Sequence, residues 1–488
     1  EIGVRLVGSE MCIRDRSVCV EKHDVTAAII LAAGDGTRMR SETPKVLHPF
    51  AGKTFLNRVM DAMNGVNPKK LAVVVHAQAE RVAAAAVSYN ENVHIVNQDE
   101  TPGTGRAVQC AIKDLNEIAK NETGETLKGA VLIAASDMPL LDTQTLQSLV
   151  DFHNNNNNVA TVLTAVLDDA TGYGRIVREA NGDVLRIVEH KDANAGELAI
   201  HEVNTSVYVF DATVLCDAIA DLNSQNAQGE FYLTDALEHA RKFGHVGAMS
   251  APDPLTVEGV NNRVQLAALA KAHNKRVCEK WMLEGVTILD PDTTWIEDSV
   301  TLAQDVTVLP GCFLQGRTTV ASGAVVGPYT TLIDAQIDED AVVERSRVQE
   351  SHICRAANIG PWTYLRAGNV LGEESKAGAF VEMKKAHIGN GTKVPHLSYI
   401  GDADLGEHTN IGGGTITANY DGVHKNHTTI GSGAHVGAGN LFVAPVTVGD
   451  DVTTGAGSVV RHDVPADSMV YSENTQHVVE NWKPAWER

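Results

Sequence analysis

Val25–Met39 reads "VTAAIILAAGDGTRM", a stretch that predicts a buried strand followed at once by a glycine loop. Its first nine residues are almost entirely apolar, as in a strand that is covered on both faces of a sheet. Gly34 and Gly36 allow a tight turn and a close approach of backbone N–H groups to phosphate oxygens. Arg38 and Lys45 add cationic donors just after the turn. The stretch therefore predicts a phosphate-binding loop at the end of the first strand.

The segments that follow alternate between strand-like and helix-like patterns. Strands are expected at 25–33, 70–75, 93–98 and 130–137, and helices at 55–63 and 105–115. This alternation predicts βαβ units and an α/β N-terminal domain with a Rossmann-like, mostly parallel sheet. Ligands of such sheets bind beyond the carboxyl ends of the strands. The glycine loop itself is neither a dinucleotide fingerprint, which needs a third glycine, nor a Walker A loop, which needs Gly-Lys-Thr/Ser.

The second half of the chain has a different period. Residues 261–284 contain no Gly or Pro and predict a connecting helix, and beyond Thr287 aliphatic residues recur every six positions. A sustained period of six predicts a left-handed parallel β-helix of hexapeptide repeats, with the repeated residue inside and a flat outer surface that suits trimer formation. The repeated residues are Ile296, Leu302, Val308, Leu314, Val320, Val326, Leu332, Ile359, Leu365, Leu371, Ile388, Val394, Ile400, Ile430, Val436, Phe442 and Val448.

These patterns predict a division of the 488 residues into four parts. Residues 1–20 have no strand or helix periodicity and no apolar core of a secretory signal, so we expect a non-native or disordered extension. Residues 21–260 are expected to form the α/β domain, 261–285 a linker helix, and 286–488 the β-helix.

Composition limits the classes of partner. The formal charge of −22 gives no broad basic surface for nucleic acid or an anionic membrane, so anionic ligands must be held by local donors. No apolar run reaches the roughly 20 residues of a membrane span. The seven cysteines show no CxxC spacing, which indicates reduced thiols and a cytoplasmic location.

Several motifs together resemble one enzyme family. "LAAGDGTRM", "TPKVLH", "QDETPGTGRAV", "TGYGRI", "EVNTSVY", "HLSYIGDADLGEHTNIG" and "NYDG" are similar in order to those of the bifunctional N-acetylglucosamine-1-phosphate uridylyltransferase/glucosamine-1-phosphate N-acetyltransferases. The resemblance covers about Val25 to Trp482. It implies acetylation of glucosamine 1-phosphate by acetyl-CoA, then uridylyl transfer from UTP to N-acetylglucosamine 1-phosphate with Mg²⁺. The product, UDP-N-acetylglucosamine, feeds peptidoglycan and lipopolysaccharide-type envelope precursors, and a homotrimer is expected.

The resemblance also implies the residues of the uridylyl site. Asp137 and Asn261 correspond to the metal ligands, and two oxygen ligands with phosphates and water suit octahedral Mg²⁺. Arg38 and Lys45 would act in catalysis by facing the triphosphate. The residues implied to bind substrate are Leu31, Ala32, Ala33, Gly34, Lys45, Gln98, Gly103, Thr104, Gly174, Glu189, Asn204 and Asn261. Ala135-Ser136 stands where many relatives carry Tyr-Gly, so contacts of that tyrosine side chain are not carried over.

The acetyl site is implied to centre on His396 in "KVPHLSYIGD". Acetylation needs an uncharged amine, and a histidine with an ordinary pKa of about 6.5 can accept its proton near neutral pH. Arg366, Lys384, Tyr399 and Asn410 correspond to the sugar-phosphate site, and the residues implied to contact acetyl-CoA are Gly413, Asn419, Tyr420, Ala438 and Ala456.

Three positions depart from the family pattern in this half. Gly413 stands where relatives often have Ala, and Ala438 where they often have Ser, so a serine hydroxyl contact is not expected. Glu473 falls near a position where some relatives carry an arginine that contacts CoA. Since its anion would repel phosphate, Lys425 or a neighbouring subunit is expected to bind that phosphate instead.

Three alternatives remain at this point. The chain could be a single-function sugar-1-phosphate nucleotidyltransferase whose β-helix serves only to form oligomers. It could carry a zinc site resembling that of the hexapeptide-repeat carbonic anhydrases, with candidate ligands His387, His396, His408, His424, His427 and His435. A purely structural trimeric scaffold would leave the glycine loop, Lys45 and Asp137 without a purpose.

Overall fold

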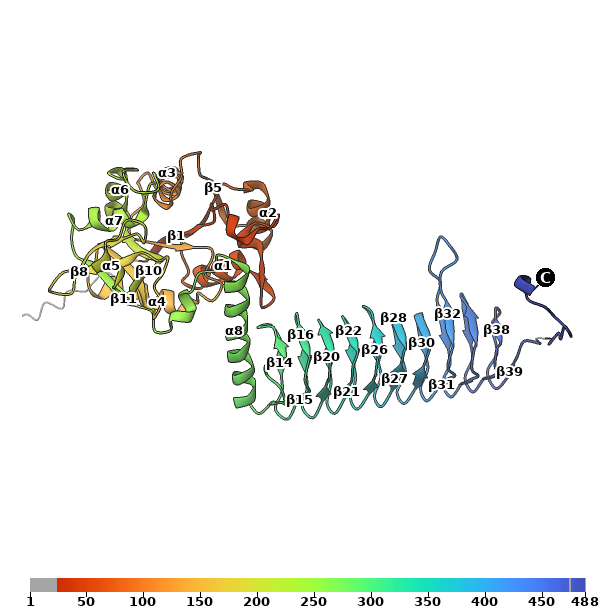
Figure 1. Cartoon of the computed structure of the whole chain (residues 1–488). Coiled ribbons are helices and arrows are strands. Elements are labelled where there is room, and N and C mark those ends of the chain that lie inside the picture. Colours follow the sequence, from red (N-terminus) through yellow and green to blue (C-terminus); the bar gives the residue numbers. More distant parts are fainter. Residues whose placement is uncertain (1–23, 474, 488) are drawn as a thin grey trace, which may run out of the picture. The chain divides into compact units, whose positions relative to one another are not determined.

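The computed structural model describes residues 24–473 and 475–487 (Figure 1). The predicted extension at 1–20 lies outside the described residues. Contacts divide the described residues into two compact units, and the boundary in the sequence, between Leu269 and Ala270, falls within the helix α8 (Arg263–Leu283). Among the described residues, no helix combines the length and the apolar character that a bilayer crossing requires.

The first unit is built on a mostly parallel sheet, as its sequence predicts. Four strands lie at the predicted places and pair in parallel, with β1 in the middle between β6 and β4. β10 is antiparallel to both of its neighbours, and the β8–β9 hairpin extends from it. In spatial order the strands are β11 (Val246–Ser250), β7 (Ala160–Val166), β10 (Glu202–Asp211), β6 (Ala130–Ala135), β1 (Val25–Leu31), β4 (Lys70–Val75) and β5 (His94–Asn97), with β8 (Arg175–Arg178) and β9 (Val184–Val188) off this path.

Helices cover both faces of this sheet, which is why its strands are apolar throughout. Alternate residues of β1 enter different cores: Ala28 and Ile30 pack with α1, α2 and α4, whereas Ala27 and Ile29 pack with α3, α6 and α7. All four are fully buried. The helices are α1 (Phe55–Gly65), α2 (Ala79–Tyr89), α3 (Thr104–Thr123), α4 (Thr143–Asn155), α5 (Ala195–Leu198), α6 (Ala212–Ala220) and α7 (Leu233–Ala240).

The second unit is a left-handed parallel β-helix of short strands, from β12 (Thr287–Ile288) to β39 (Met469–Val470). Trp295 pairs with Phe313 and Thr301 with Thr319, so one coil takes 18 residues there. The repeated aliphatic residues of the sequence are all buried and form one continuous core. The hexapeptide prediction is therefore confirmed.

Irregular coils explain why the period of six changes phase along the chain. Val320 pairs with Ile337 and Leu332 with Val348, so these coils are shorter than 18 residues. The largest change lies between β30 (Tyr399–Leu405) and β33 (Thr428–Ile430), where Ala403 pairs with Thr428. The extra residues leave the coil after β32 (Ile416–Ala418) as a long hairpin, visible in Figure 1. This hairpin, residues 419–427, carries the "NYDG" motif.

Candidate functional sites

A cavity of about 400 Å³ opens at the carboxyl ends of the parallel strands in the first unit. Leu31, Gln98 and Asp137 reach it from the ends of β1, β5 and β6, because strands that run in parallel end at the same edge of the sheet. A second cavity of about 280 Å³ shares the glycine loop and Lys45 with it, and is also lined by Arg38 and Asn261.

Lys45 joins the two residues that were predicted to hold a metal ion. Its Nζ donates to Asp137 Oδ2 at 2.6 Å and to Asn261 Oδ1 at 2.9 Å. Arg38 donates to the same Asn261 oxygen, also at 2.9 Å. The lysine side chain is only 13% exposed and the carboxylate 25%. Arg38, Lys45, Asp137 and Asn261 therefore form one connected cluster, in which both oxygen donors contact the Lys45 ammonium group.

The local backbone fixes both oxygen donors. The Asp137 carbonyl accepts a hydrogen bond from the N–H of Val260 at 2.9 Å, and the Asn261 N–H donates to Gln265 Oε1 at 2.8 Å. Carboxylate and amide oxygens are the ligands that Mg²⁺ prefers, and both lie within hydrogen-bond distance of one ammonium group. The donor set thus fits a small divalent cation at the place where Lys45 now supplies the positive charge.

The two glycines of the loop serve different structural purposes. Gly36 has φ 60°, and a Cβ there would lie 2.6 Å from Lys45 Cβ, so the turn that brings Lys45 to Asp137 requires glycine. Gly34 has nothing within 4 Å of the position that a Cβ would take, so it leaves cavity space open. Behind the loop, the buried Ser136 hydroxyl donates to the carbonyl of Leu31 at 2.7 Å and fastens β6 to β1.

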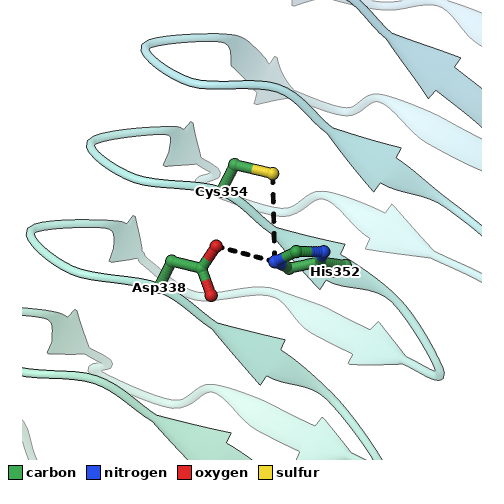
Figure 2. A group of neighbouring side chains, drawn as sticks. All are labelled: Asp338, His352 and Cys354. Atoms are coloured by element: carbon green, nitrogen blue, oxygen red, sulfur yellow. Dashed lines mark hydrogen bonds and ion pairs between the residues drawn. The ribbon is translucent and has the colours of Figure 1, made fainter.

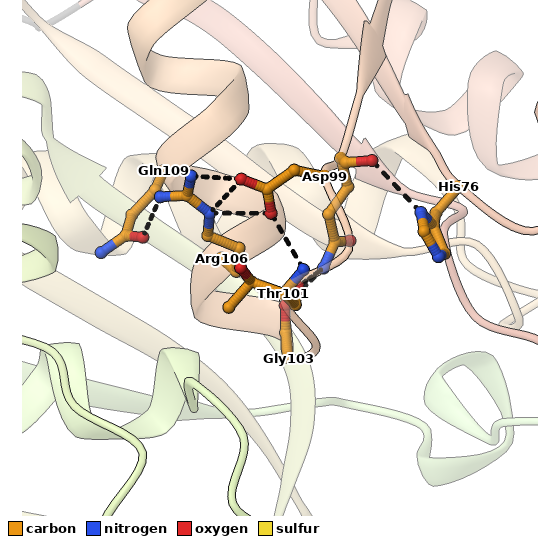
Figure 3. A network of polar contacts seen from close by, with 7 residues as sticks. His76, Asp99, Thr101, Gly103, Arg106 and Gln109 are labelled. Carbon is orange, nitrogen blue, oxygen red and sulfur yellow. Dashed lines mark hydrogen bonds and ion pairs between the residues drawn. The ribbon is translucent and has the colours of Figure 1, made fainter.

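The segment after β5 forms a tight loop that an ion pair braces (Figure 3). Gln98 Nε2 donates to the carbonyls of Thr101 at 2.8 Å and Gly103 at 3.3 Å. Asp99 accepts from Arg106 Nε at 3.1 Å and from the Thr101 N–H at 3.1 Å. The Arg106 guanidinium holds the pKa of Asp99 well below its usual range, so this carboxylate stays charged at neutral pH.

Close backbone packing fixes the other end of this loop. A Cβ on Gly103, whose φ is 122°, would lie 2.3 Å from the carbonyl oxygen of Phe231. The Leu233 N–H donates to Thr104 Oγ1 at 3.1 Å. The predicted residues Gln98, Gly103 and Thr104 are therefore held in one rigid piece of the cavity wall.

Gly174, Glu189 and Asn204 meet beside the β8–β9 hairpin. The Asn204 N–H donates to the carbonyl of Gly174 at 2.9 Å, and a Cβ on Gly174 would lie 3.4 Å from the Glu189 carboxylate. Burial raises the pKa of Glu189, whose Oε1 accepts from Thr234 Oγ1 at 3.5 Å.

Most of the predicted uridylyl residues line one of the two cavities, and a few do not. The predicted residues on the walls are Leu31, Ala33, Gly34, Arg38, Lys45, Gln98, Gly103, Thr104, Asp137 and Asn261. Those outside both linings are Ala32, Gly174, Glu189 and Asn204. Sequence reasoning missed wall residues such as Ser206 and Tyr208, although both lie in the motif "EVNTSVY", because only Asn204 of that motif was assigned a role.

In the β-helix, His396 lies at the end of β29 (Lys393–His396) and is exposed. A Cβ on Gly413 would lie 2.6 Å from both Cδ2 and Nε2 of the imidazole. The ring therefore lies directly over Gly413 of the next coil, in space that an alanine methyl group would take. The departure noted at Gly413 thus has a physical consequence, because it lets the ring approach the backbone.

Basic side chains gather on neighbouring coils. Lys384 lies on β28 (Glu382–Ile388), and Lys425 beside it, with Arg366, lowers its pKa. Arg366 also pairs with Glu382 at 3.3 Å. Lys425 comes from the hairpin 419–427, which Asn419 fastens to the coil by donating to Asp402. This cluster of cations suits a phosphate group.

Gly413, Ala438 and Ala456, three of the predicted acetyl-CoA residues, lie at one corner of successive coils. The N–H groups of Gly414, Gly439 and Gly457 donate to the carbonyls of Leu397, Gly413 and Ala438 at 2.8–2.9 Å. These three glycines have φ between 71° and 79° and expose bare backbone, whereas the preceding coils carry Trp362, Phe380 and Leu397 at this corner. From the coil after His396 onward, this corner therefore carries no large side chain. Sequence motifs alone did not reveal this feature. Ala456 packs against Gly437 in the same stack.

Tyr399 and Asn410 lie on strands of different sheets of the β-helix. Tyr399 pairs with Glu382 in the strand register, and its hydroxyl would lie 2.4 Å from a Cβ on Gly401. Asn410, on β31 (Asn410–Ile411), pairs with Lys393 on one side and His435 on the other. Tyr420 is exposed on the hairpin, where its hydroxyl donates to the carbonyl of Gly422 at 2.6 Å.

The histidines proposed for a carbonic-anhydrase-like zinc site do not form one in the described residues. His387 Nδ1 and His427 Nε2 each contact a different oxygen of Asp404 at 2.9 Å. Across residues 24–473 and 475–487, the only group of three potential ligand atoms within 4.8 Å of one another contains none of the six histidines named above.

Comparisons with known proteins agree with both halves of this description. The MobA-like NTP transferase domain matches residues 28–228. The "Bifunctional protein GlmU" of Bifidobacterium longum (strain NCC 2705) is 74% identical over 95% of this chain and 100% of its own length, and that of Bifidobacterium adolescentis is 76% identical over the same shares. The protein of that name from Paenarthrobacter aurescens is 51% identical over 94% of this chain and 91% of its own. The chain belongs to the family of bifunctional GlmU proteins.

Proposed function

We propose that this chain makes UDP-N-acetylglucosamine in two steps at two separate sites. Acetyl-CoA first acetylates the amine of glucosamine 1-phosphate in the β-helix. UTP then transfers its uridylyl group to N-acetylglucosamine 1-phosphate in the α/β unit, and pyrophosphate leaves. The product supplies cell-envelope synthesis, and the enzyme is a homotrimer of the cytoplasm, which fits its free thiols at Cys110, Cys216, Cys278, Cys312 and Cys354.

In uridylyl transfer, the protein positions two anionic reactants for an in-line displacement. The sugar-phosphate oxygen attacks the α-phosphorus of UTP, and the bond to the pyrophosphate oxygen breaks. Asp137 and Asn261 would hold Mg²⁺, which when bound neutralises phosphate charge. Lys45 and Arg38 bind the phosphate oxygens and stabilise the charge that grows on the leaving group. Each already donates to a metal-ligand oxygen, so UTP and cation binding would redirect these donors to phosphate.

The remaining predicted residues determine which nucleotide and which sugar bind. The loop of Gln98, Gly103 and Thr104 presents fixed amide and backbone groups to the uracil ring, with Leu31, Ala32, Ala33 and Gly34 on the other side of the nucleotide. Gly174, Glu189 and Asn204 hold the sugar beyond the cavity wall. Because the loop is braced by Arg106 and Asp99, little ordering is needed when UTP binds.

In acetyl transfer, His396 accepts a proton from the amine of glucosamine 1-phosphate. The amine nitrogen attacks the carbonyl carbon of the thioester, and the carbon–sulfur bond breaks. Coenzyme A leaves as the thiol after its sulfur takes up a proton. Arg366, Lys384, Tyr399 and Asn410 hold the sugar phosphate. Acetyl-CoA binds at the glycine-lined corner of the coils, here called the glycine corner. Its contacts there are Gly413, Ala438 and Ala456, together with Asn419 and Tyr420 of the hairpin.

The observation that carries this proposal is the presence of two complete donor sets in separate units of one chain. The oxygens of Asp137 and Asn261 meet at Lys45 in one, and the other carries both the exposed His396 over Gly413 and a cluster of cations around Lys384. A β-helix that only formed oligomers would need neither the exposed histidine nor the hairpin.

The test is to supply purified protein with glucosamine 1-phosphate, acetyl-CoA, UTP and Mg²⁺ and to omit one component at a time. The two-step account expects N-acetylglucosamine 1-phosphate to accumulate when UTP is omitted, and no nucleotide sugar when acetyl-CoA is omitted. If N-acetylglucosamine 1-phosphate supports pyrophosphate release but acetyl-CoA is never consumed, the single-function alternative holds instead.

A further inference from the structure

Asp338, His352 and Cys354 form a cluster on the outside of the β-helix, and none of the three belongs to the residues assigned above (Figure 2). His352 Nε2 lies 2.7 Å from Asp338 Oδ2 and 3.9 Å from Cys354 Sγ. One ligand atom from each residue lies within 4.8 Å of the other two. All three side chains are half-buried, so a small ion can reach them while the coil holds them in place.

The strand register brings these residues together. Gln336 on β20 (Gln336–Ile337) pairs with His352 on β23 (His352–Ile353), and each strand ends in a buried isoleucine. Asp338 and Cys354 follow those isoleucines at equivalent positions of adjacent coils. The Asp338 N–H donates to the carbonyl of Ile353 and the Cys354 N–H to that of Leu371, both at 2.9 Å. The backbone on both sides of the cluster is therefore part of the rigid parallel ladder.

Carboxylate, imidazole and thiolate are together a donor set for a borderline transition metal such as Zn²⁺. Metal–ligand distances of about 2.0–2.3 Å in a tetrahedral site hold the ligand atoms roughly 3.3–3.7 Å apart. The observed 2.7 and 3.9 Å lie on either side of this range, and the third pair of ligand atoms lies within 4.8 Å, so shifts of up to about one ångström would complete three of four positions. Mg²⁺ prefers oxygen ligands only, which separates this cluster from the site at Asp137.

The surrounding charge also favours a cation. The carboxylates of Asp338 and Glu373 both lie close to the Cys354 thiol. The nearby Arg355 is engaged by Glu373 at 2.5 Å. A divalent ion would relieve the repulsion between these anions and stabilise the thiolate, with release of the thiol proton to solvent.

We propose that Asp338, His352 and Cys354 bind one Zn²⁺-like divalent transition-metal ion, with a solvent molecule as the fourth ligand. The ion links two adjacent coils of the β-helix. Because none of its ligands takes part in either proposed reaction, its removal is expected to leave both transferase activities in place.

Co²⁺ titration of the full-length, reduced and metal-stripped protein tests the site, because a cobalt–thiolate bond gives a charge-transfer absorption that nitrogen and oxygen ligands do not. We expect this band with the tetrahedral cobalt spectrum, and its loss when Zn²⁺ is added. Because the chain has seven cysteines, single substitutions are needed to show which thiolate binds Co²⁺. Cys354→Ser should abolish the band, and Asp338→Asn should weaken Co²⁺ binding about tenfold or more.

Cys216→Ser is the matched control, since Cys216 is also half-buried but contacts Asn116 and is not part of the cluster. It should keep the full band. The proposal is overturned if wild-type protein gives no charge-transfer band at saturating Co²⁺, or if the band survives in Cys354→Ser. Normal activity and thermal stability of the metal-free variants show that they are folded.

Discussion

At the residue scale, the proposed uridylyl site depends on a few positions. At some of them only glycine fits, and at another the burial of an acidic side chain raises its pKa. Gly36 and Gly103 both combine positive φ with a close neighbour, Lys45 Cβ in one case and a Phe231 carbonyl in the other. Glu189 is held half-buried where its protonated form is favoured. Each of these features can be tested by a single substitution.

Gly103→Ala should destabilise the first unit by about 2 kcal/mol or more, because the added methyl group lies 2.3 Å from a backbone oxygen that cannot move freely. It should also raise the KM for UTP, since Gly103 fixes the loop of Gln98. Gly124→Ala is the control: its φ is 80°, but nothing lies within 4 Å of its Cβ position, so only about 1 kcal/mol of backbone strain is expected. Thermal unfolding measures both, and equal losses would contradict the packing argument.

Glu189→Gln should stabilise the protein at pH 7–8 by about 1 kcal/mol and lose most of that gain near pH 4. Burial raises the folded-state pKa of Glu189 above its unfolded value, so the protonated carboxyl stabilises the fold below the unfolded pKa, and this contribution is lost as the pH rises through the folded pKa. The amide removes the ionisation. Unfolding midpoints at the two pH values measure the effect, and an equal change at both would contradict it. Binding of the sugar should weaken in this variant.

At the element scale, short strands with a fixed register place the acetyl site, and the hairpin 419–427 completes it. His396 and Gly413 come from adjacent coils, while Lys425 reaches Lys384 only because extra residues leave the coil between β30 and β33. The ladder therefore supplies a rigid base, and the hairpin supplies groups that a regular hexapeptide coil could not place there.

Lys425→Ala should raise the KM of the acetyl-transfer reaction about tenfold for the phosphate-bearing substrate that the cluster binds, without a change in uridylyl transfer. The reason is the loss of one cation from the group of Lys384, Lys425 and Arg366. Arg317→Ala, which removes an arginine that is 92% exposed on an early coil, should change neither reaction. Initial rates at varied glucosamine 1-phosphate and acetyl-CoA identify the substrate. Unchanged KM values for both would exclude Lys425 from binding.

The sequence predicted elements better than it predicted contacts. Residues 70–75 are a strand exactly as expected, and every repeated aliphatic residue of the hexapeptides is buried, because periodicity reports burial directly. The convergence of Asp137 and Asn261 on Lys45 could be expected only through the family resemblance, since Asn261 follows no strand of the sheet. The Asp99–Arg106 brace and the glycine corner beyond His396 depend on side-chain and coil geometry, which spacing in the sequence does not determine.

At the scale of the whole molecule, the chain consists of two units, and one proposed site lies in each. Its net charge of −22 opposes the approach of anionic substrates, so each site must bind them through its own cations. The account's central claim is that the two activities are independent of each other in their catalytic residues.

The most direct test measures both half-reactions on Asp137→Ala and His396→Ala proteins. We expect Asp137→Ala to lose uridylyl transfer by a factor of at least about 100 and to retain acetyl transfer, because it removes a carboxylate that holds the cation and pairs with Lys45. His396→Ala should lose acetyl transfer by a similar factor, through loss of the general base, and retain uridylyl transfer. If either substitution abolishes both reactions in a folded protein, or if His396→Ala still acetylates at the wild-type rate, the account of two separate sites is wrong.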